Sequence, residues 1–407
     1  MHNLFFEFWE NFRHNLFKPL LLFFYTGFTV PLLGVKLDFP QVIYQGLTIY
    51  LLLAIGWHGG EELALLPRDQ LANAAGFMLV GFLTNFVIGC LAYLFLRVGT
   101  RLRRVDAATV SGYYGSDSAG TFVTCIGVLT SARIVYAPYM PVMLAVMEIP
   151  GCLVALFLVA MLRRQGMDPQ GNMPDEEGYD PEAKPSLVLM DIAEGAHGHP
   201  TAYSQGANEE AEMALEKPNG YGHHRAMGKD EPILSPELLH EVFLNPGLFL
   251  LFAGIAIGFV SGFQGYTSDP DKLFLALFPG LLCLFLLEMG MTASRKLRDL
   301  RTAGWRFVVF GLLAPNLFAT IGILVAHAYS MATHQPFDIG TYVLFSVLCG
   351  AASYIAVPAV QRLAIPEASP TLPLAASLGL TFSYNVTVGI PLYIQIAKQV
   401  KDTWPVA

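Results

Sequence analysis

Two stretches of the chain, one in each half, are similar enough to decide the fold. Residues 55–89 read IGWHGGEELALLPRDQLANAAGFMLVGFLTNFVIG, and residues 287–322 read LEMGMTASRKLRDLRTAGWRFVVFGLLAPNLFATIG. In both, glycines mark the end of an apolar segment, and a short polar link follows. A second apolar segment then carries a Gly and an Asn close together, at Gly81 to Asn85 and at Gly311 to Asn316. This correspondence predicts an internal repeat.

The composition indicates a membrane protein. Of the 407 residues, 54% are hydrophobic and 14% are charged, whereas soluble domains carry about 25% charged residues. A helix needs about 20 mostly apolar residues to cross a bilayer. We therefore predict an all-α polytopic membrane protein with about ten transmembrane helices. The predicted spans are residues 19–36, 41–57, 73–97, 107–130, 137–162, 245–264, 272–291, 307–330, 339–362 and 371–398.

The ten spans divide into two halves of five, residues 18–162 and 244–398, followed by a tail at 399–407. Because five is odd, the second half enters the membrane the other way up, which predicts a 5+5 inverted repeat. The links agree, since the first carries Glu61 and Glu62 and the second is basic. The alternative is chance similarity between apolar segments. Inverted repeats are common in secondary transporters, because two inverted halves can exchange conformations.

Two further segments differ in composition from the spans. Residues 1–17 are aromatic-rich and amphipathic, which predicts a helix at the membrane surface. Residues 163–243 form a polar insert, and 163–241 carry 16 acidic and 6 basic side chains, a net charge of −10. We expect residues 168–230 to be flexible or partly disordered, and 235–243 to form a helix. His197, His199, His223 and His224 match no standard zinc pattern.

Three loops carry most of the arginines. They contain Arg97, Arg101, Arg103 and Arg104 after the third span, Arg163 and Arg164 after the fifth, and Arg295, Lys296, Arg298, Arg301 and Arg306 after the seventh. Positive loops stay in the cytoplasm, and with ten spans these three share one side. We therefore predict a multi-pass protein of the plasma (inner) membrane, with both termini outside and a cytoplasmic acidic insert.

Small and hydroxyl residues interrupt the fourth span of each half. Residues 111–121 read SGYYGSDSAGT, and residues 349–358 read CGAASYIAVP. Where a helix breaks near the midplane, the free N–H groups of a half-helix favour an anion. The alternative is close helix packing through small residues. The predicted anion-binding residues are Gly115, Ser116, Ser118, Gly120, Thr121 and Ser353.

Two acidic residues, Asp117 and Glu148, lie within predicted spans. Such residues are costly in lipid and usually functional, and a carboxylate there can hold Na⁺ or carry a proton. Asn85 and Asn316 can add amide oxygens, although a helix-to-helix hydrogen bond explains each equally well. The predicted cation-binding residues are these four. We predict no other metal, no cofactor besides Na⁺ as coupling ion, and no nucleic-acid partner. No nucleophile–base pair or metal motif points to an enzyme.

At these residues the chain resembles the sodium-dependent bicarbonate transporters, a family first described in cyanobacteria. The resemblance covers nearly all of the membrane part. It rests on Val105-Asp106-Ala107, Gly115-x-x-Ser118-x-x-Thr121, Met147-Glu148-Ile149-Pro150, Met289-Gly290-Met291, Leu313-Ala314-Pro315, Arg362-x-x-Ile365-Pro366 and Gly389-Ile390-Pro391-Leu392. It implies Na⁺/HCO₃⁻ symport, a homotrimer, elevator-like movement of a core domain against a gate domain, and a PII-like regulatory protein docking on the cytoplasmic side.

The chain departs from the family at the proposed site. The family's ninth span is Ser-rich and ends in Asp, whereas the matching positions here are residues 351–354, Ala-Ala-Ser-Tyr. The family's Asp in the fifth span is Glu148, and an acidic Asp117 replaces an apolar residue. A carboxylate has thus moved from one broken helix to the other. The insert is also longer than in the cyanobacterial proteins.

We predict a secondary active transporter that imports a small anion, with Na⁺-coupled bicarbonate symport as the first hypothesis. One alternative is a proton- or sodium-coupled carrier of another small organic or inorganic anion, with Asp117 as the proton site. Another is a membrane receptor that does not transport and acts through its acidic insert.

Overall fold

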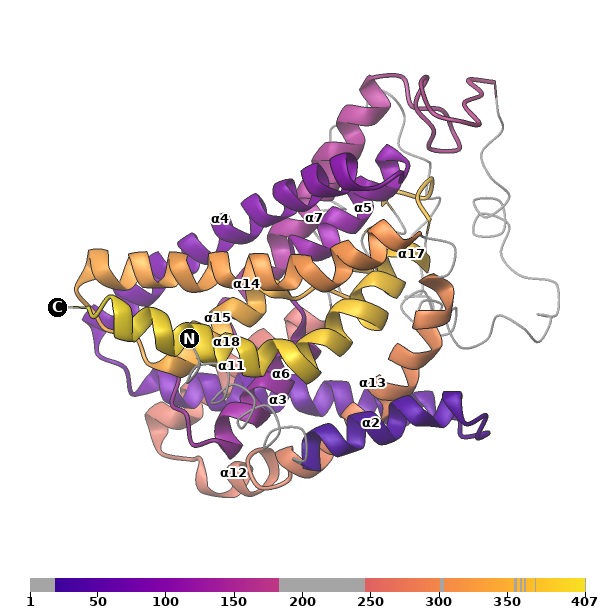
Figure 1. The fold of residues 1–407 in the computed structure, drawn as a ribbon. Coiled ribbons are helices and arrows are strands. Elements are labelled where there is room, and N and C mark those ends of the chain that lie inside the picture. Colours follow the sequence, from indigo (N-terminus) through magenta and orange to yellow (C-terminus); the bar gives the residue numbers. More distant parts are fainter. Residues whose placement is uncertain are drawn as a thin grey trace, which may run out of the picture.

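The fold is helical throughout the part of the chain that the structure describes (Figure 1). This computed structural model describes residues 19–182, 246–300, 304–354, 357–358, 361, 364–369 and 371–406. The predicted helices at 1–17 and 235–243 lie outside these residues, as do the histidines of the insert. A receptor role for the insert therefore stays a prediction.

The helices of the first half follow the predicted spans. They are α2 (Pro19–Leu32), α3 (Gln41–Ala64), α4 (Arg68–Gly99), α5 (Arg104–Tyr114), α6 (Ala119–Ser131) and α7 (Met140–Arg164). The second half contains α11 (Pro246–Gln264), α12 (Ser268–Phe274), α13 (Phe278–Asp299), α14 (Trp305–Thr333), α15 (Ile339–Gly350), α17 (Thr371–Leu374), η2 (Ala375–Phe382), η3 (Asn385–Gly389) and α18 (Ile390–Thr403). Within the described residues, five stretches are long and apolar enough to span a membrane, namely 42–64, 72–99, 140–164, 268–297 and 305–333.

The fourth predicted span of each half is broken where the sequence becomes rich in small residues. Residues 115–118 separate α5 from α6, and α15 ends at Gly350 before the extended residues 351–354. Glycine weakens a helix because it loses the most backbone entropy when the helix forms. Serine weakens it because its hydroxyl hydrogen-bonds to nearby backbone groups in non-helical conformations. The first break therefore follows from local composition, whereas Ala351 and Ala352 favour helix and do not explain the second.

Two expectations from the sequence are wrong in detail. The seventh span was expected as one helix over 272–291, but α12 ends at Phe274 and α13 begins at Phe278. Pro279 explains this, because proline is favoured in the first turn of a helix and disfavoured inside one. The insert was expected to be flexible from Asp168, yet residues 168–182 form a hydrogen-bonded segment that packs against the start of α5.

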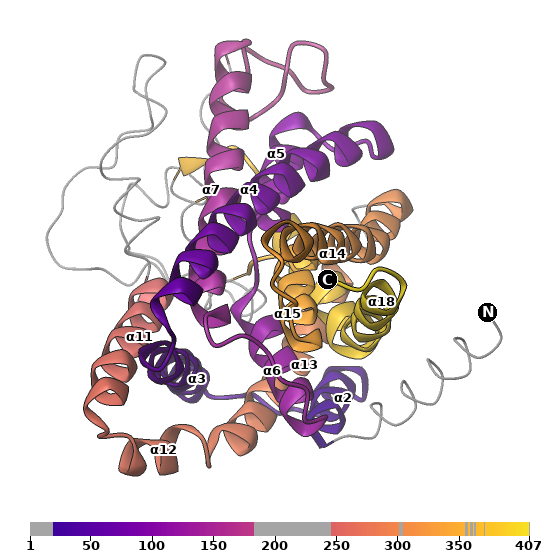
Figure 2. The same ribbon diagram turned by 90° about the vertical axis from the view of Figure 1, so that its left-hand side faces the viewer.

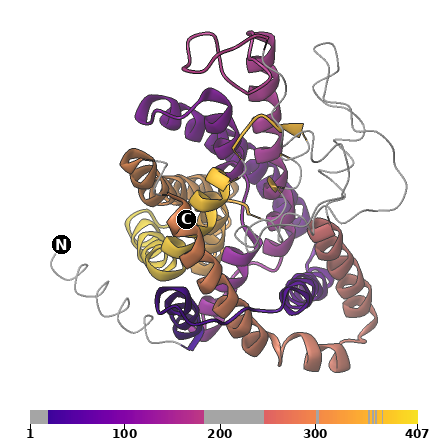
Figure 3. The same ribbon diagram turned by 90° about the vertical axis from the view of Figure 1, so that its right-hand side faces the viewer.

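Four helices pair across the two halves through glycines. The first helix of each half packs on the second of the other, α2 on α13 and α3 on α11 (Figure 2 and Figure 3). A Cβ at Gly27 would meet the Leu287 carbonyl, and a Cβ at Gly290 would meet the Phe24 carbonyl. Such contacts let backbones approach closely. We call α2, α3, α11, α12 and α13 the gate group.

The remaining helices form the core group, which contains α4 to α7, α14, α15 and α17 to α18. Within it α4 packs on α5, α7 and α14, and α15 packs on α14 and α18. Figure 2 shows this group beside the gate group. Both broken helices belong to the core group, so the candidate site lies among its buried polar residues.

Candidate functional site

The first helix break is held by a contact between three glycines. A Cβ added at Gly115 would lie 2.9 Å from the Cα of Gly89 in α4 and 3.2 Å from the Cα of Gly151 in α7. Glycine thus allows the backbone of the break to lie directly against two helices. The predicted anion ligand Gly115 therefore has a packing role.

The break exposes the first backbone N–H groups of α6 to the interior of the core group. Ser118 is the N-cap, and its Oγ accepts the Thr121 backbone N–H at 3.3 Å and the Thr121 hydroxyl at 3.0 Å. The N–H groups of Ala119 and Gly120 have no partner among the described residues. Unpaired N–H groups at a helix start carry partial positive charge. Ser118, Gly120 and Thr121, all predicted anion ligands, thus lie together at the start of α6, which we call the α6 corner.

The second break lies against the first. The Ser353 N–H donates to the carbonyl of Tyr113 at the end of α5, at 2.8 Å, and Ser353 itself is buried. Asn385 holds the last residue of α15, because its amide N–H donates to the Gly350 carbonyl at 2.9 Å while its Oδ1 accepts the Tyr393 hydroxyl at 2.7 Å. The structure therefore brings Ser353 to the same region as the α6 corner.

Tyr354, which was not among the predicted site residues, also lies at this corner. A Cβ at Gly120 would overlap its hydroxyl oxygen, so the hydroxyl lies against the first turn of α6. The ring packs edge-on against Phe382 of η2, with centroids 5.6 Å apart. Phe285 of the gate group also approaches Gly120. The only sequence signal was its departure from the family pattern.

Asp117 is the most unusual polar group of the site. Its side chain is 0% exposed, and neither carboxylate oxygen has a hydrogen-bond partner among the described residues. It interacts electrostatically with Glu148 of α7, which is also buried, and with Cys349 of α15. A buried carboxylate is strongly disfavoured unless it is neutralised. Asp117 therefore needs a proton or a cation.

Two neighbouring backbone carbonyls of α7 accept hydrogen bonds from side chains of other segments. The Ser116 hydroxyl donates to the Glu148 carbonyl at 2.7 Å, and the Asn85 amide donates to the Met147 carbonyl at 2.9 Å. The Asn85 Oδ1 atom is buried and has no hydrogen-bond partner in the described part of the chain. Asn85 thus offers an oxygen near Glu148, whereas the Ser116 hydroxyl donates its hydrogen to the Glu148 carbonyl.

Asn316 has different neighbours from the other predicted cation ligands. It lies on α14, where its amide donates to the Leu312 carbonyl at 3.0 Å and its Oδ1 accepts the Tyr384 hydroxyl at 2.7 Å. No hydrogen bond links it to Asp117, Glu148 or Asn85 in the described structure. Its contact to Tyr384 is the helix-to-helix bond that the sequence left open.

The chain matches a known family over nearly its whole length. A family model described as the Na⁺-dependent bicarbonate transporter superfamily matches residues 19–398. The match includes both broken helices and all ten predicted site residues, and it confirms the resemblance found in the sequence. No curated protein matches the chain.

Proposed function

The chain belongs to the Na⁺-dependent bicarbonate transporter superfamily, and from this premise we propose that it imports bicarbonate by symport with Na⁺. Members of this family are transporters, so the chain is a multi-pass membrane transport protein and not an enzyme. The observation that carries the symport proposal is Asp117, a buried carboxylate without a hydrogen-bond partner in the described structure.

We assign the anion to the α6 corner. The free N–H groups of Ala119 and Gly120 supply two donors, and the Ser118 and Thr121 hydroxyls lie beside them. Bicarbonate is small and has three oxygens, so it can accept several hydrogen bonds at once. The Tyr354 hydroxyl against Gly120 limits the space at the corner, which favours a small anion over a bulky one.

We assign the cation to Asp117, Glu148 and the Asn85 Oδ1 atom. Hard cations such as Na⁺ prefer carboxylate and amide oxygens, and all three groups are buried. Without a cation, two carboxylates close together repel each other. Cation binding removes this repulsion and lowers the negative potential near the α6 corner, which supports coupling of the anion to the cation.

We propose an elevator-type transporter built on a 5+5 inverted repeat. The reciprocal packing of α2 on α13 and of α3 on α11 supports a two-fold relation between the halves. Since the gate group contains neither break, the core group is the part that would carry the ions. Homotrimeric assembly and a PII-like regulator remain proposals that rest on family membership.

For orientation we propose that the arginine-rich end is cytoplasmic. Arg103 donates to the Gln170 carbonyl and Arg163 donates to Glu367, so the ends of α4 and α7 lie on one side of the molecule. Positive charge gathered at one end favours the cytoplasmic side of the plasma (inner) membrane. With ten spans, a cytoplasmic arginine-rich end would place both termini outside.

The test is uptake of labelled bicarbonate by proteoliposomes, with and without an inward Na⁺ gradient. We expect uptake to require the Na⁺ gradient and to stay low with K⁺ in its place. Equal uptake in both would rule out Na⁺ symport.

Proton coupling is the second candidate, because protonation would also neutralise the isolated Asp117 carboxyl. It predicts uptake of a small anion driven by a pH gradient without Na⁺. The same vesicles under an inward proton gradient distinguish the two mechanisms.

A further inference from the structure

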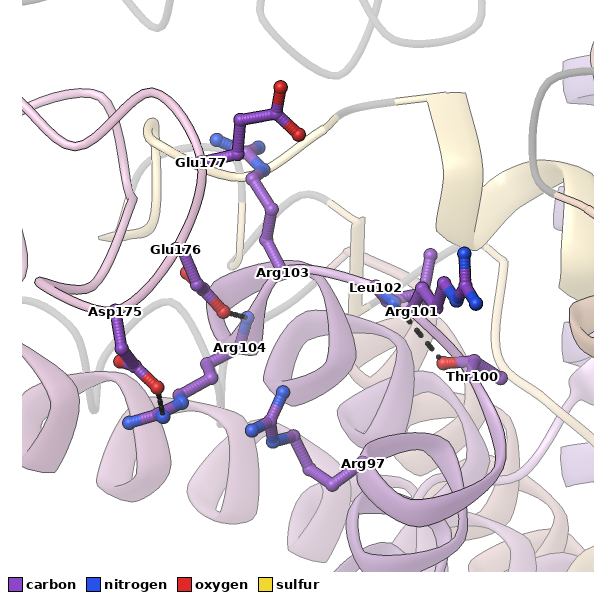
Figure 4. Close-up of a pocket in the computed structure, with 9 residues that line it drawn as sticks. All are labelled: Arg97, Thr100, Arg101, Leu102, Arg103, Arg104, Asp175, Glu176 and Glu177. Carbon is purple, nitrogen blue, oxygen red and sulfur yellow. Dashed lines mark hydrogen bonds and ion pairs between the residues drawn. The ribbon is translucent and has the colours of Figure 1, made fainter.

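A second charged site lies at the end of α4, apart from both helix breaks. It is a cavity of about 460 Å³ between the α4–α5 turn and the 165–182 segment (Figure 4). Its lining residues are Arg97, Thr100, Arg101, Leu102, Arg103, Arg104, Asp175, Glu176 and Glu177. Four arginines therefore meet three carboxylates around one cavity.

The arginines are unevenly neutralised. Arg103 forms an ion pair with Asp106 at 2.8 Å and also donates to the Gln170 carbonyl. Arg97 and Arg101, by contrast, have no hydrogen bond or ion pair with any described residue. Arg104 pairs with Asp175 through one terminal nitrogen, while its Nε is buried and has no partner in the described structure. The guanidinium groups of Arg97 and Arg101 are thus left without an ion pair in the described structure, and the lining has one more arginine than carboxylates.

The carboxylates on the opposite wall have separate functions. Glu176 is structural, because it accepts the backbone N–H of Arg104 at 2.8 Å and that of Met173 at 3.0 Å. It therefore attaches the segment to the first turn of α5. The Asp175 side chain is 63% exposed, and among the described residues it forms an ion pair only with the Arg104 guanidinium. An exposed ion pair of this kind contributes little, so another anion can replace Asp175.

The surroundings indicate which anion fits. Arg97 lies in the last turn of α4, a membrane-spanning helix, and its neighbours Leu94 and Val98 are exposed. Apolar side chains exposed on a spanning helix face lipid tails, so the cavity lies at the depth of lipid headgroups. Guanidinium groups bind phosphate oxygens through paired hydrogen bonds.

We propose that this cavity binds the phosphate group of an anionic phospholipid. Arg97 and Arg104 hold the phosphate, Arg101 lies at the rim, and Asp175 competes with the lipid for Arg104. The acyl chains extend along Leu94 and Val98. The bound lipid then links the end of α4, the start of α5 and the 165–182 segment.

The test measures binding of short-chain phosphatidylglycerol to the detergent-purified full chain, with short-chain phosphatidylcholine and inorganic phosphate as separate probes. Arg97→Gln should weaken phosphatidylglycerol binding about tenfold, as expected for one charge-assisted contact. Because Arg97 has no partner among the described residues, this change should leave folding intact. Asp175→Asn should strengthen binding, since it removes the competing carboxylate.

Asp38→Asn is the matched control. It removes the same charge from an exposed ion pair, Asp38 with Arg295, outside the cavity, and should leave binding unchanged. The proposal is overturned if Arg97→Gln binds like the wild type, or if Asp38→Asn strengthens binding as much as Asp175→Asn. Competition by inorganic phosphate as strong as that of the lipid would also overturn it, in favour of a soluble phosphate ligand.

Discussion

Two aspartates near the first break differ in what surrounds them. Asp106 pairs with Arg103 at 2.8 Å and accepts the Ser369 N–H at 2.8 Å, whereas Asp117 has no hydrogen-bond partner in the described structure. We expect Asp117→Asn to abolish Na⁺-dependent uptake while leaving the unfolding temperature equal or higher, because a buried charge is removed.

Asp106→Asn is the comparison, and it should lower stability by about 1–3 kcal/mol through loss of charged hydrogen bonds. Thermal unfolding and vesicle uptake, measured on both variants, separate the two roles. Retention of Na⁺-dependent uptake by Asp117→Asn would contradict the cation assignment.

Tyr354 offers a test of the anion corner. Tyr354→Phe keeps the ring against Phe382 but removes the hydroxyl from the start of α6. We expect the KM for bicarbonate to rise by up to about tenfold, the effect of one hydrogen bond, with the unfolding temperature unchanged. Tyr384→Phe, whose hydroxyl bonds to Asn316, is the control. An unchanged KM in Tyr354→Phe would remove this residue from the site.

At the scale of elements, the crossing of α3 and α11 depends on glycine. A Cβ at Gly60 would clash with the Ile255 carbonyl, whereas Gly46 in the same helix has open space around it. Gly60→Ala should therefore lower stability by about 1–3 kcal/mol, the usual cost of overpacking. Gly46→Ala should change the unfolding temperature little. Equal stability of the two variants would argue against this helix crossing.

The 165–182 segment predicts a dependence on pH. Burial raises the pKa of the Asp168 carboxyl, but N–H groups of Asp180, Asn172 and Gln170 donate to it, and its net pKa falls below the usual value. A lowered pKa means that Asp168 stabilises the fold above its unfolded pKa of about 3.9. That contribution is lost as the pH falls through the folded value.

We therefore expect amide exchange in residues 165–182, corrected for intrinsic rates, to be slow near neutral pH and to rise below about pH 4. Asp168→Asn should raise exchange at all pH values. The exposed Asp180 carboxylate only accepts the Glu182 N–H, so Asp180→Asn should leave the protection unchanged. Constant protection of the wild type down to pH 3 would refute the role of Asp168.

At the scale of the whole molecule, the proposed elevator requires the core group to slide against the gate group. A Cβ at Gly379 in η2 would lie 3.6 Å from the Cα of Leu297 in α13, across the two groups. In a background without the native cysteines, a disulfide between Leu297→Cys and Gly379→Cys should stop uptake, and a reductant should restore it.

A disulfide inside the core group is the control for this experiment. A Cβ at Gly311 would lie 3.2 Å from the Cβ of Leu380, so Gly311→Cys and Leu380→Cys can be linked without joining the two groups. Uptake should continue in this variant. Continued uptake with the core linked to the gate would exclude sliding between them.

The sequence alone determined the class of the protein and the local structure of its site. Runs of apolar residues predict spanning helices because lipid excludes unpaired backbone groups. The glycine and two serines within 115–118 predict a break because they disfavour helix. The order of short motifs across both halves also identified the family, which the family match confirms.

Only the tertiary structure decided which groups meet. It showed that Asp117 lacks a hydrogen-bond partner in the described chain, that the Tyr354 hydroxyl lies on Gly120, and that Asn316 bonds to Tyr384. It also showed an ordered start to the acidic insert. These facts depend on contacts between residues far apart in the chain. Helix periodicity and composition report only on neighbours, so they specify helices and breaks but not partners.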